Sequence, residues 1–150
     1  MNTELSGQRA RLLKEHLAYC EHNYQLWCHL FANSDHGQGW LNASQLGSVH
    51  YQAVDNTKYT QTYWLRLEPH LDKAQTAWLT LCLPVRIYHD MRVAEVLADQ
   101  TGRQYPGVNP YPNDRMWLPD EKVRLNAHLN LWLRACCCAD NMHHNLCQSP

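Results

Sequence analysis

The sequence predicts an α+β fold, a four-stranded antiparallel meander sheet packed with an N-terminal and a C-terminal amphipathic helix. Apolar residues recur with helical spacing near both ends of the chain and alternate with polar residues in its middle. The alternating segments have short connections, which favours antiparallel strands because parallel strands need long crossovers. We expect the 150 residues to form a single domain, with an ordered core over residues 8–138 and a loose tail over residues 139–150.

The first predicted element is a helix over residues 8–32. Its apolar residues follow alternating spacings of four and three, which places them on one side of a helix. This stripe consists of Leu13, Leu17, Cys20, Tyr24, Trp27 and Phe31. Turn-forming residues at positions 33–37 are expected to end the helix.

Four strands are predicted next, over residues 49–53, 59–67, 77–89 and 93–98, where the apolar period is two. One face of the third strand carries Leu79, Leu81, Leu83, Val85 and Ile87. We expect both helices to pack on this face, because each helix has an apolar stripe to bury.

The hairpin between the last two strands has a predictable register. A loop of two or four residues around Met91 and Arg92 puts the apolar faces of the two strands on the same side. A three-residue loop would instead set Ile87 opposite Glu95 and place a carboxylate in the core. With the even loop, Tyr88 and Glu95 are expected to be direct cross-strand partners, with Arg86 diagonal to Glu95.

A proline-rich segment over residues 102–118 predicts an irregular loop. The last helix is expected to start near Pro119, a residue that suits the first helical position. Its apolar stripe is Leu125, Leu129, Trp132, Leu133 and Cys136. Order is expected to be lost past Cys138.

Bulk composition bounds the function. The formal net charge is −1 and no basic patch is longer than residues 9–14, so we expect no nucleic-acid partner. The N-terminus lacks the features of a signal peptide, and no apolar run is long enough to span a bilayer. Seven cysteines, an odd number, are then expected to be reduced thiols. These observations predict a cytoplasmic protein without a membrane partner.

Several short motifs resemble one protein family. The longest are Val85-Arg86-Ile87-Tyr88-His89-Asp90 and Val93-Ala94-Glu95-Val96. Others are Cys20-Glu21 with Asn23-Tyr24, Thr57-Lys58-Tyr59-Thr60, Tyr111-Pro112-Asn113, Asp120-Glu121-Lys122, and Trp132-Leu133-Arg134 with Cys136. Together they resemble the YqiB-like family of small proteobacterial proteins, a domain of unknown function, over residues 17–136. The resemblance implies a cytoplasmic bacterial protein and brings no catalytic residue to this chain.

The strongest polar cluster consists of Arg86, Tyr88, His89, Asp90 and Glu95, and Tyr111 and Asn113 of the loop are expected to form its rim. A guanidinium suits carboxylates and phosphates, and the acid, tyrosine and histidine are groups used in acid–base catalysis. Three alternatives stay open. The cluster is a binding site, a catalytic site, or a cross-strand Arg86–Glu95 ion pair with a structural role, His89 being bonded to backbone.

Two tryptophans beside arginine mark a second candidate surface. Trp64, Arg66, Trp78 and Cys82 share the face of the sheet opposite to its predicted core. If exposed, this combination is typical of a protein–protein interface. A helix or the proline-rich loop is the alternative cover for these side chains.

Cysteine and histidine crowd the C-terminal tail at Cys137, Cys138, His143, His144 and Cys147. Thiolates and imidazoles are zinc ligands, but adjacent cysteines on a helix diverge and the paired spacing of zinc ribbons is missing. We therefore expect no cofactor, with zinc in the tail as the minor alternative. Cys20 and Cys136 are expected to be core thiols, a redox pair being the alternative.

These observations favour a non-catalytic interaction or regulatory protein that binds a protein partner. The alternative is a protein that handles a small ligand or a nucleotide, as a binding protein or as an enzyme, and uses the cluster around Arg86, Tyr88 and Glu95. A deep pocket lined by the cluster would favour the ligand. A flat face with exposed Trp64 or Trp78 would favour the protein partner.

Overall fold

The structure is a computed structural model that describes residues 2–31, 37–70, 81–97 and 119–147, with side chains over residues 6–31, 37–70, 81–97 and 121–140. It confirms the α+β class, with five strands rather than the four expected. The elements are helix α1 (Asn2–Phe31), strands β1 (Gln38–Asn42), β2 (Gly47–Asn56), β3 (Thr60–Pro69), β4 (Leu81–Tyr88) and β5 (Val93–Val96), and helix α3 (Pro119–Cys147).

The sheet is an antiparallel meander in the order β1-β2-β3-β4-β5. Strand β1 is the additional strand, and its residues Gln38 to Asn42 pair with Gln52 to Ser48 of β2. Its exposure alternates between exposed and half-buried, without a fully buried position. A five-residue edge strand of this kind carries too little apolar alternation to be distinguished from the turn residues before it.

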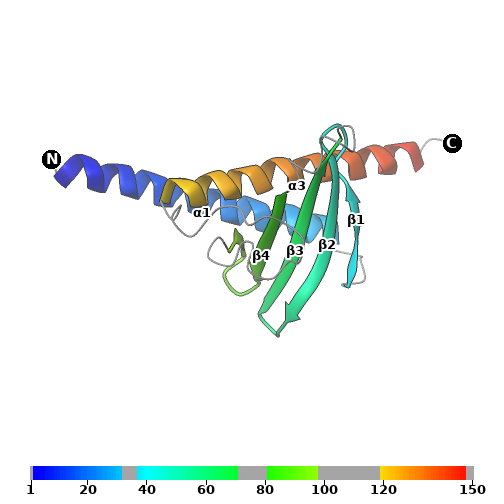
Figure 1. Cartoon of the computed structure of the whole chain (residues 1–150), viewed down its shortest axis with the longest axis horizontal. Coiled ribbons are helices and arrows are strands. Elements are labelled where there is room, and N and C mark those ends of the chain that lie inside the picture. The colour runs from blue at the N-terminus through cyan, green and yellow to red at the C-terminus, as the bar shows by residue number, and fades with distance from the viewer. Residues whose placement is uncertain (1, 32–36, 71–80, 98–118, 148–150) are drawn as a thin grey trace.

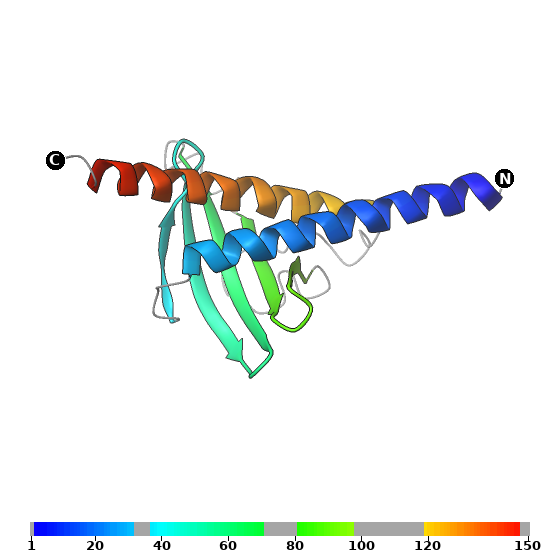
Figure 2. The same ribbon diagram turned by 180° about the vertical axis from the view of Figure 1, so that it is seen from behind.

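The two helices lie side by side across one face of the sheet, as Figures 1 and 2 show from opposite sides. The two helices are parallel. Asn23 of α1 contacts Asn126 of α3, and His29, later in α1, contacts Asp140, later in α3. Helix α1 projects beyond one edge of the sheet with its N-terminal part, and α3 projects beyond the other with its C-terminal part (Figure 1).

One core fills the space between the helices and the sheet, as expected for two amphipathic helices on one face. The sheet contributes Leu83, Val85 and Ile87, and α3 contributes Leu129 and Trp132. Further members are Trp27, Phe31, Val49, Tyr51, Tyr63, Leu65, Leu67, Ala94, Val96, Leu125, Leu133 and Cys136. The predicted packing face of the third strand is confirmed at these three positions, while Leu79 lies outside the described residues.

The predicted stripe of the first helix is correct only in its second half. Cys20, Trp27 and Phe31 are buried, but Leu13 and Leu17 are 67% and 48% exposed. The helix begins at Asn2 and its contribution to the main core starts only at Tyr24, so Leu13 and Leu17 lie before the turns that pack on the sheet. At the other end, α3 continues to Cys147, beyond the end expected near Cys138.

Candidate functional site

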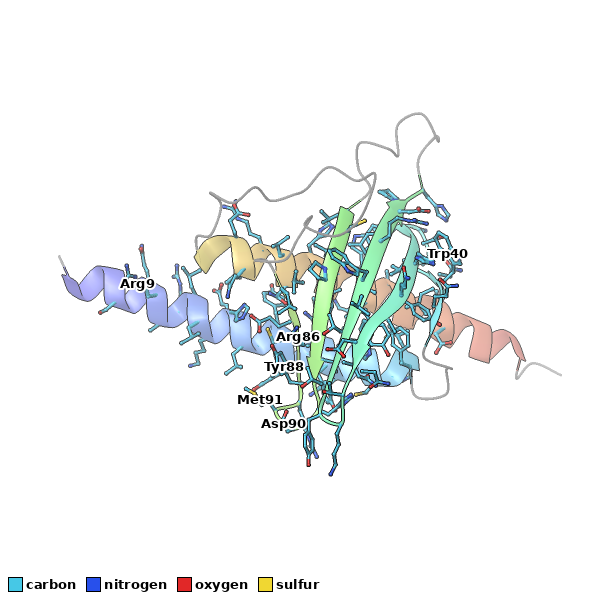
Figure 3. The ribbon with its side chains drawn as sticks, turned by 60° about the horizontal axis from the view of Figure 1, so that its bottom comes forward. Arg9, Trp40, Arg86, Tyr88, Asp90 and Met91 are labelled. Carbon is cyan, nitrogen blue, oxygen red and sulfur yellow. The ribbon has the colours of Figure 1, made fainter. Side chains whose placement is uncertain are left out.

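The predicted hairpin cluster is divided by the structure into side chains with separate contacts. Arg86 and Glu95 are direct partners in the register, so the even loop is confirmed. The loop has four residues, which pairs Tyr88 with Val93 and corrects the expected Tyr88–Glu95 pair. The Arg86 Nε donates to Thr62 Oγ1 at 3.2 Å on the neighbouring strand. Figure 3 shows Arg86, Tyr88, Asp90 and Met91 following one another along β4 and its turn.

Glu95 meets both helices at the sheet edge. Its Oε1 lies 3.4 Å from His16 Nε2 of α1 and 3.9 Å from Lys122 Nζ of α3. The hydrogen bond from His16, together with the charges of His16, Lys122 and Arg86, lowers the pKa of Glu95 despite its partial burial. Glu95 therefore connects the sheet to the helix pair, a role that the register alone did not predict.

His89 lies at the centre of a short hydrogen-bonded chain. Its Nε2 is 3.2 Å from Gln61 Oε1, and its Nδ1 is 3.1 Å from the Tyr24 hydroxyl. Because a carbonyl oxygen only accepts, Nε2 carries the proton, so in the neutral ring Nδ1 accepts from Tyr24. The backbone N–H of His89 also donates to Tyr59 O at 2.9 Å, as the structural alternative expected. The structural alternative required only a backbone hydrogen bond, whereas the His89 side chain also bonds to Tyr24 and Gln61.

An open cavity of about 650 Å³ lies next to the Tyr24–His89–Gln61 hydrogen bonds, between α1 and the turn that connects β4 and β5. It is lined by Glu21, Tyr24, Gln25, Cys28, Met91 and Arg92. Arg92 has a φ of 55°, in the left-handed region that few residues other than glycine adopt. The cavity uses the turn next to the predicted cluster, whereas Arg86 and Glu95 are not among its lining residues.

A second, smaller hollow lies between the N-terminal half of α1 and the start of α3. It has a volume of about 310 Å³ and is lined by Arg9, Leu12, Leu13, His16 and Lys122. Its leucines are apolar, and its other members are basic side chains. We call this hollow, together with exposed Leu17, the α1 groove.

The structure bears on the two alternatives left open for the tryptophan surface. Trp64 is buried at 9% exposure, which favours the covered alternative, and Trp78 lies outside the described residues. The Arg66 Nε contacts Glu68 Oε1 at 2.6 Å, and its guanidinium lies 5.4 Å from the ring centroid of Trp40. Trp40 is 54% exposed, so the exposed tryptophan beside Arg66 comes from the strand that the sequence did not predict.

Burial and spacing in the structure bear on the predicted core thiols and on the possible metal ligands. Burial raises the pKa of Cys20 and of Cys136 to about 12, as for core thiols. Cys20 lies beside Asn126, about ten residues before Cys136 on α3, so the parallel helices keep these two cysteines apart. No cluster of three potential metal ligands occurs among the described residues, which exclude the side chains of His143, His144 and Cys147. Tyr111 and Asn113 also lie outside them.

The protein is therefore an α+β protein in which two parallel helices cover one face of an antiparallel meander sheet. No helix in the described part of the chain is long and apolar enough to cross a membrane.

Comparison with known proteins places the chain in a family. The family model "Protein of unknown function (DUF1249)" matches residues 27–142. The chain is 30% identical to "Uncharacterized protein YqiB" of Escherichia coli K12 over 124 residues, which cover 81% of this chain and 86% of the relative. The same values hold for the proteins of that name in strains O6:H1 and O157:H7. The chain therefore belongs to the DUF1249 family, which confirms the resemblance. No solved structure matches it.

Several residues of these sites were not singled out from the sequence as site residues. Tyr24 and Lys122 belong to the family-like motifs, but nothing in their spacing showed that they meet the hairpin. Cys28 lies one helical turn after Tyr24, and this spacing is a signal that could have joined the two. Gln61 carries no local signal, because its partner is set by the pairing of β3 with β4.

Proposed function

We propose that this protein is a non-catalytic interaction module that binds a protein partner through the α1 groove. The supporting observation is the exposure of Leu13 and Leu17, at 67% and 48%, on a helix whose later turns are buried in the core. A helix in water gains most of its stability from tertiary packing of its apolar face. The projecting turns of α1 lack that packing within the described structure, and a partner would supply it.

The chemistry of the α1 groove indicates the kind of partner. Leu12 and Leu13 offer an apolar surface, and Arg9, His16 and Lys122 line it with basic groups, of which His16 and Lys122 also contact Glu95. Arg11 and Lys14 add two exposed cations nearby, against one acid, Glu15, among residues 6–20. An amphipathic helix with acidic residues beside its apolar stripe matches this surface in shape and in charge.

The ligand-binding alternative around Arg86, Tyr88 and Glu95 has less support. Arg86 hydrogen-bonds to Thr62, and Glu95 faces His16 and Lys122, so the two side chains are engaged with separate partners. Neither lines the large cavity. Cytoplasmic location remains part of the proposal.

The experiment compares three proteins, the wild type, Leu13→Ser/Leu17→Ser and Trp40→Ala, in their capture of partners from extracts of the native host. In Leu13→Ser/Leu17→Ser, two exposed apolar side chains are lost, so the fold should remain intact. We expect at least tenfold weaker binding of a specific protein, which corresponds to about 1.4 kcal/mol. The recovered protein is then purified, and its direct binding to the wild type and to the double variant is measured by calorimetry.

Trp40→Ala is the matched control, because Trp40 is the exposed aromatic residue of a rival surface. It should retain the partner. Loss of the partner with Trp40→Ala alone, or equal capture by all three proteins, would contradict the proposal. Flotation with anionic vesicles that depends on Leu13 and Leu17, without a protein partner, would assign the groove to a lipid surface instead.

A further inference from the structure

Strand β1 is an edge strand with backbone groups that point away from the sheet. Among the described residues, only β2 pairs with it. At its two ends, the Ala53 N–H donates to Gly37 O at 2.8 Å and the Ala43 N–H donates to Gly47 O at 2.9 Å. Because antiparallel strands bond to each other at alternate residues, the odd-numbered positions of β1 direct their N–H and C=O groups at β2. The groups that point outward are those of Gln38, Trp40 and Asn42.

This edge lacks the usual protection against further strand pairing. Natural edge strands are protected by charged residues, proline, a bulge or a covering element. Strand β1 has no charged residue and no proline, and its register with β2 has no shift. The opposite edge differs, because the Val96 N–H of β5 donates to Asn126 Oδ1 of α3 at 3.0 Å. Of the two edges, β1 is therefore the one suited to pair with another strand.

A hollow of about 210 Å³ lies along the same edge, between β1 and the helix pair, and we call it the β1 hollow. Its apolar lining includes Leu30, Leu41, Cys136 and Ala139. Among the described residues that line it, Asp140 is the charged one, and its side chain is about half exposed. The volume is below that of typical small-molecule sites and suits a single side chain.

Helix α3 covers the place that a further strand would take. It crosses the strands and projects beyond β1, as Figures 1 and 2 show. The turns from Asp140 to Cys147 extend the helix by about 10 Å, whereas neighbouring strands are about 4.8 Å apart. One added strand therefore fits beneath α3. The sheet of a second copy does not, because its own helix pair would occupy the same layer.

We infer that β1 pairs with an extended peptide segment of a partner protein, which adds one strand at this edge of the sheet. Main-chain hydrogen bonds to the outward groups supply the affinity, and side chains on the helix-covered face supply the specificity. The peptide residue opposite Leu41 has its side chain on the face of Leu41, so it points at the β1 hollow. An aliphatic residue fits there. A lysine or arginine two positions away shares that face and pairs with the Asp140 carboxylate.

The test begins with a phage-displayed library of random peptides that is selected on the full native chain. The enriched peptides should share an aliphatic residue with a lysine or arginine two positions from it. The tightest of these peptides is synthesised, and its Kd for the wild type and for each variant is measured by fluorescence anisotropy. Asp140→Asn should remove the preference for the basic residue.

Trp40→Pro and Trp40→Ala form a matched pair of variants. Both remove the indole, but only Trp40→Pro also removes the outward N–H. Proline is tolerated at an edge position whose N–H points away from the sheet, so the fold should remain intact. Trp40→Pro should bind the peptide at least tenfold more weakly than Trp40→Ala does. Melting temperatures establish that both variants are folded.

A second measurement uses the wild-type protein and does not depend on the folding of a variant. Two versions of the peptide are methylated at alternate sets of backbone nitrogens. One set faces β1, and its methylation should lower the affinity at least tenfold. The other set faces away from β1, and its methylation should leave the affinity unchanged. Equal effects of the two sets would overturn the inference.

Other outcomes would also overturn it. These are the failure to enrich the aliphatic and basic pattern, and equal Kd values for folded Trp40→Pro and Trp40→Ala. A dimer in sedimentation that Trp40→Pro dissociates would assign the edge to a second copy. Slow hydrogen exchange of the Trp40 N–H in the free monomer would assign it to another segment of this chain.

This site is separate from the α1 groove, so the two proposals can fail independently. Leu13→Ser/Leu17→Ser should bind the selected peptide with the wild-type Kd. If that variant loses the peptide while Trp40→Pro retains it, the peptide occupies the α1 groove, and the inference about β1 is overturned while the proposed function is not.

Discussion

Asn126 connects three elements through its polar atoms. Its Oδ1 accepts from the backbone N–H of Val96 at 3.0 Å, and its Nδ2 donates to Lys122 O at 2.9 Å. Its backbone oxygen accepts from Asn23 Nδ2 at 3.2 Å. Asn126 and Asn23 are both fully buried, so these hydrogen bonds replace water. A side chain of α3 thus supplies the hydrogen-bond acceptor for the Val96 N–H of the edge strand β5.

Asn126→Ala should lower the free energy of unfolding by about 1–3 kcal/mol, because it leaves the buried Val96 N–H without an acceptor. Urea denaturation measures this change. Arg134→Ala, at an exposed position of the same helix, is the control and should stay within about 0.5 kcal/mol of the wild type. Equal stability of the two variants would show that Asn126 does not have this role.

Glu95 should make stability depend on acid pH. Its pKa in the folded protein is lowered from the usual 4.5, so its contribution is present above pH 4.5 and is lost as pH falls through the folded pKa. Glu95→Gln cannot titrate, and its stability should therefore fall less steeply than that of the wild type below pH 4.5. Chemical denaturation at a series of pH values measures both slopes, and identical slopes would count against the His16–Glu95–Lys122 contact.

At the residue level, sequence reasoning placed Arg86 and Glu95 on one face of one hairpin. The alternation of apolar residues fixes that face, because a carboxylate is excluded from the core. The partners of Glu95 could not be predicted, since His16 and Lys122 reach it only through the packing of two helices distant in sequence. The same reason hid the contact between Tyr24 and His89.

At the scale of elements, the buried stripe of α3 carries much of the core. Trp132 is 5% exposed and its Nε1 lies 3.2 Å from His128 Nε2. Trp132→Ala should lower the free energy of unfolding by roughly 3–5 kcal/mol, as truncation of buried aromatic residues does. Thermal and urea denaturation measure the loss. Leu131→Ala, at a 43% exposed position, is the matched control, and an unchanged melting temperature for Trp132→Ala would contradict the described packing.

Elements with strong periodicity were predictable, and weaker ones were not. The stripe of α3 and the alternation of β3 and β4 each repeat over several buried positions, which gives a clear period. Strand β1 has only Leu41 packed against the core and Trp40 on the other side. The apolar spacing of α1 continues through Leu13, but spacing alone does not show where the sheet ends.

At the scale of the whole molecule, two parallel helices share one face of the sheet and project past opposite edges (Figure 1). The buried asparagines between the helices fix their alignment, since Asn130 Nδ2 donates to Asn23 Oδ1 at 3.0 Å. Buried polar pairs are known to set the register of paired helices. Within the residues that the structure describes, this alignment leaves Leu13 and Leu17 exposed, and Figure 3 shows Arg9 on the projecting part of α1.

The most direct test of the proposed function is site-specific photo-crosslinking in the native host. A photoreactive amino acid replaces Leu13 in the α1 groove or Val54 on β2, which is 52% exposed and serves as the control. The account predicts a crosslink to one specific protein from position 13 and not from position 54. Equal crosslinking from both positions, or none from position 13, would contradict it.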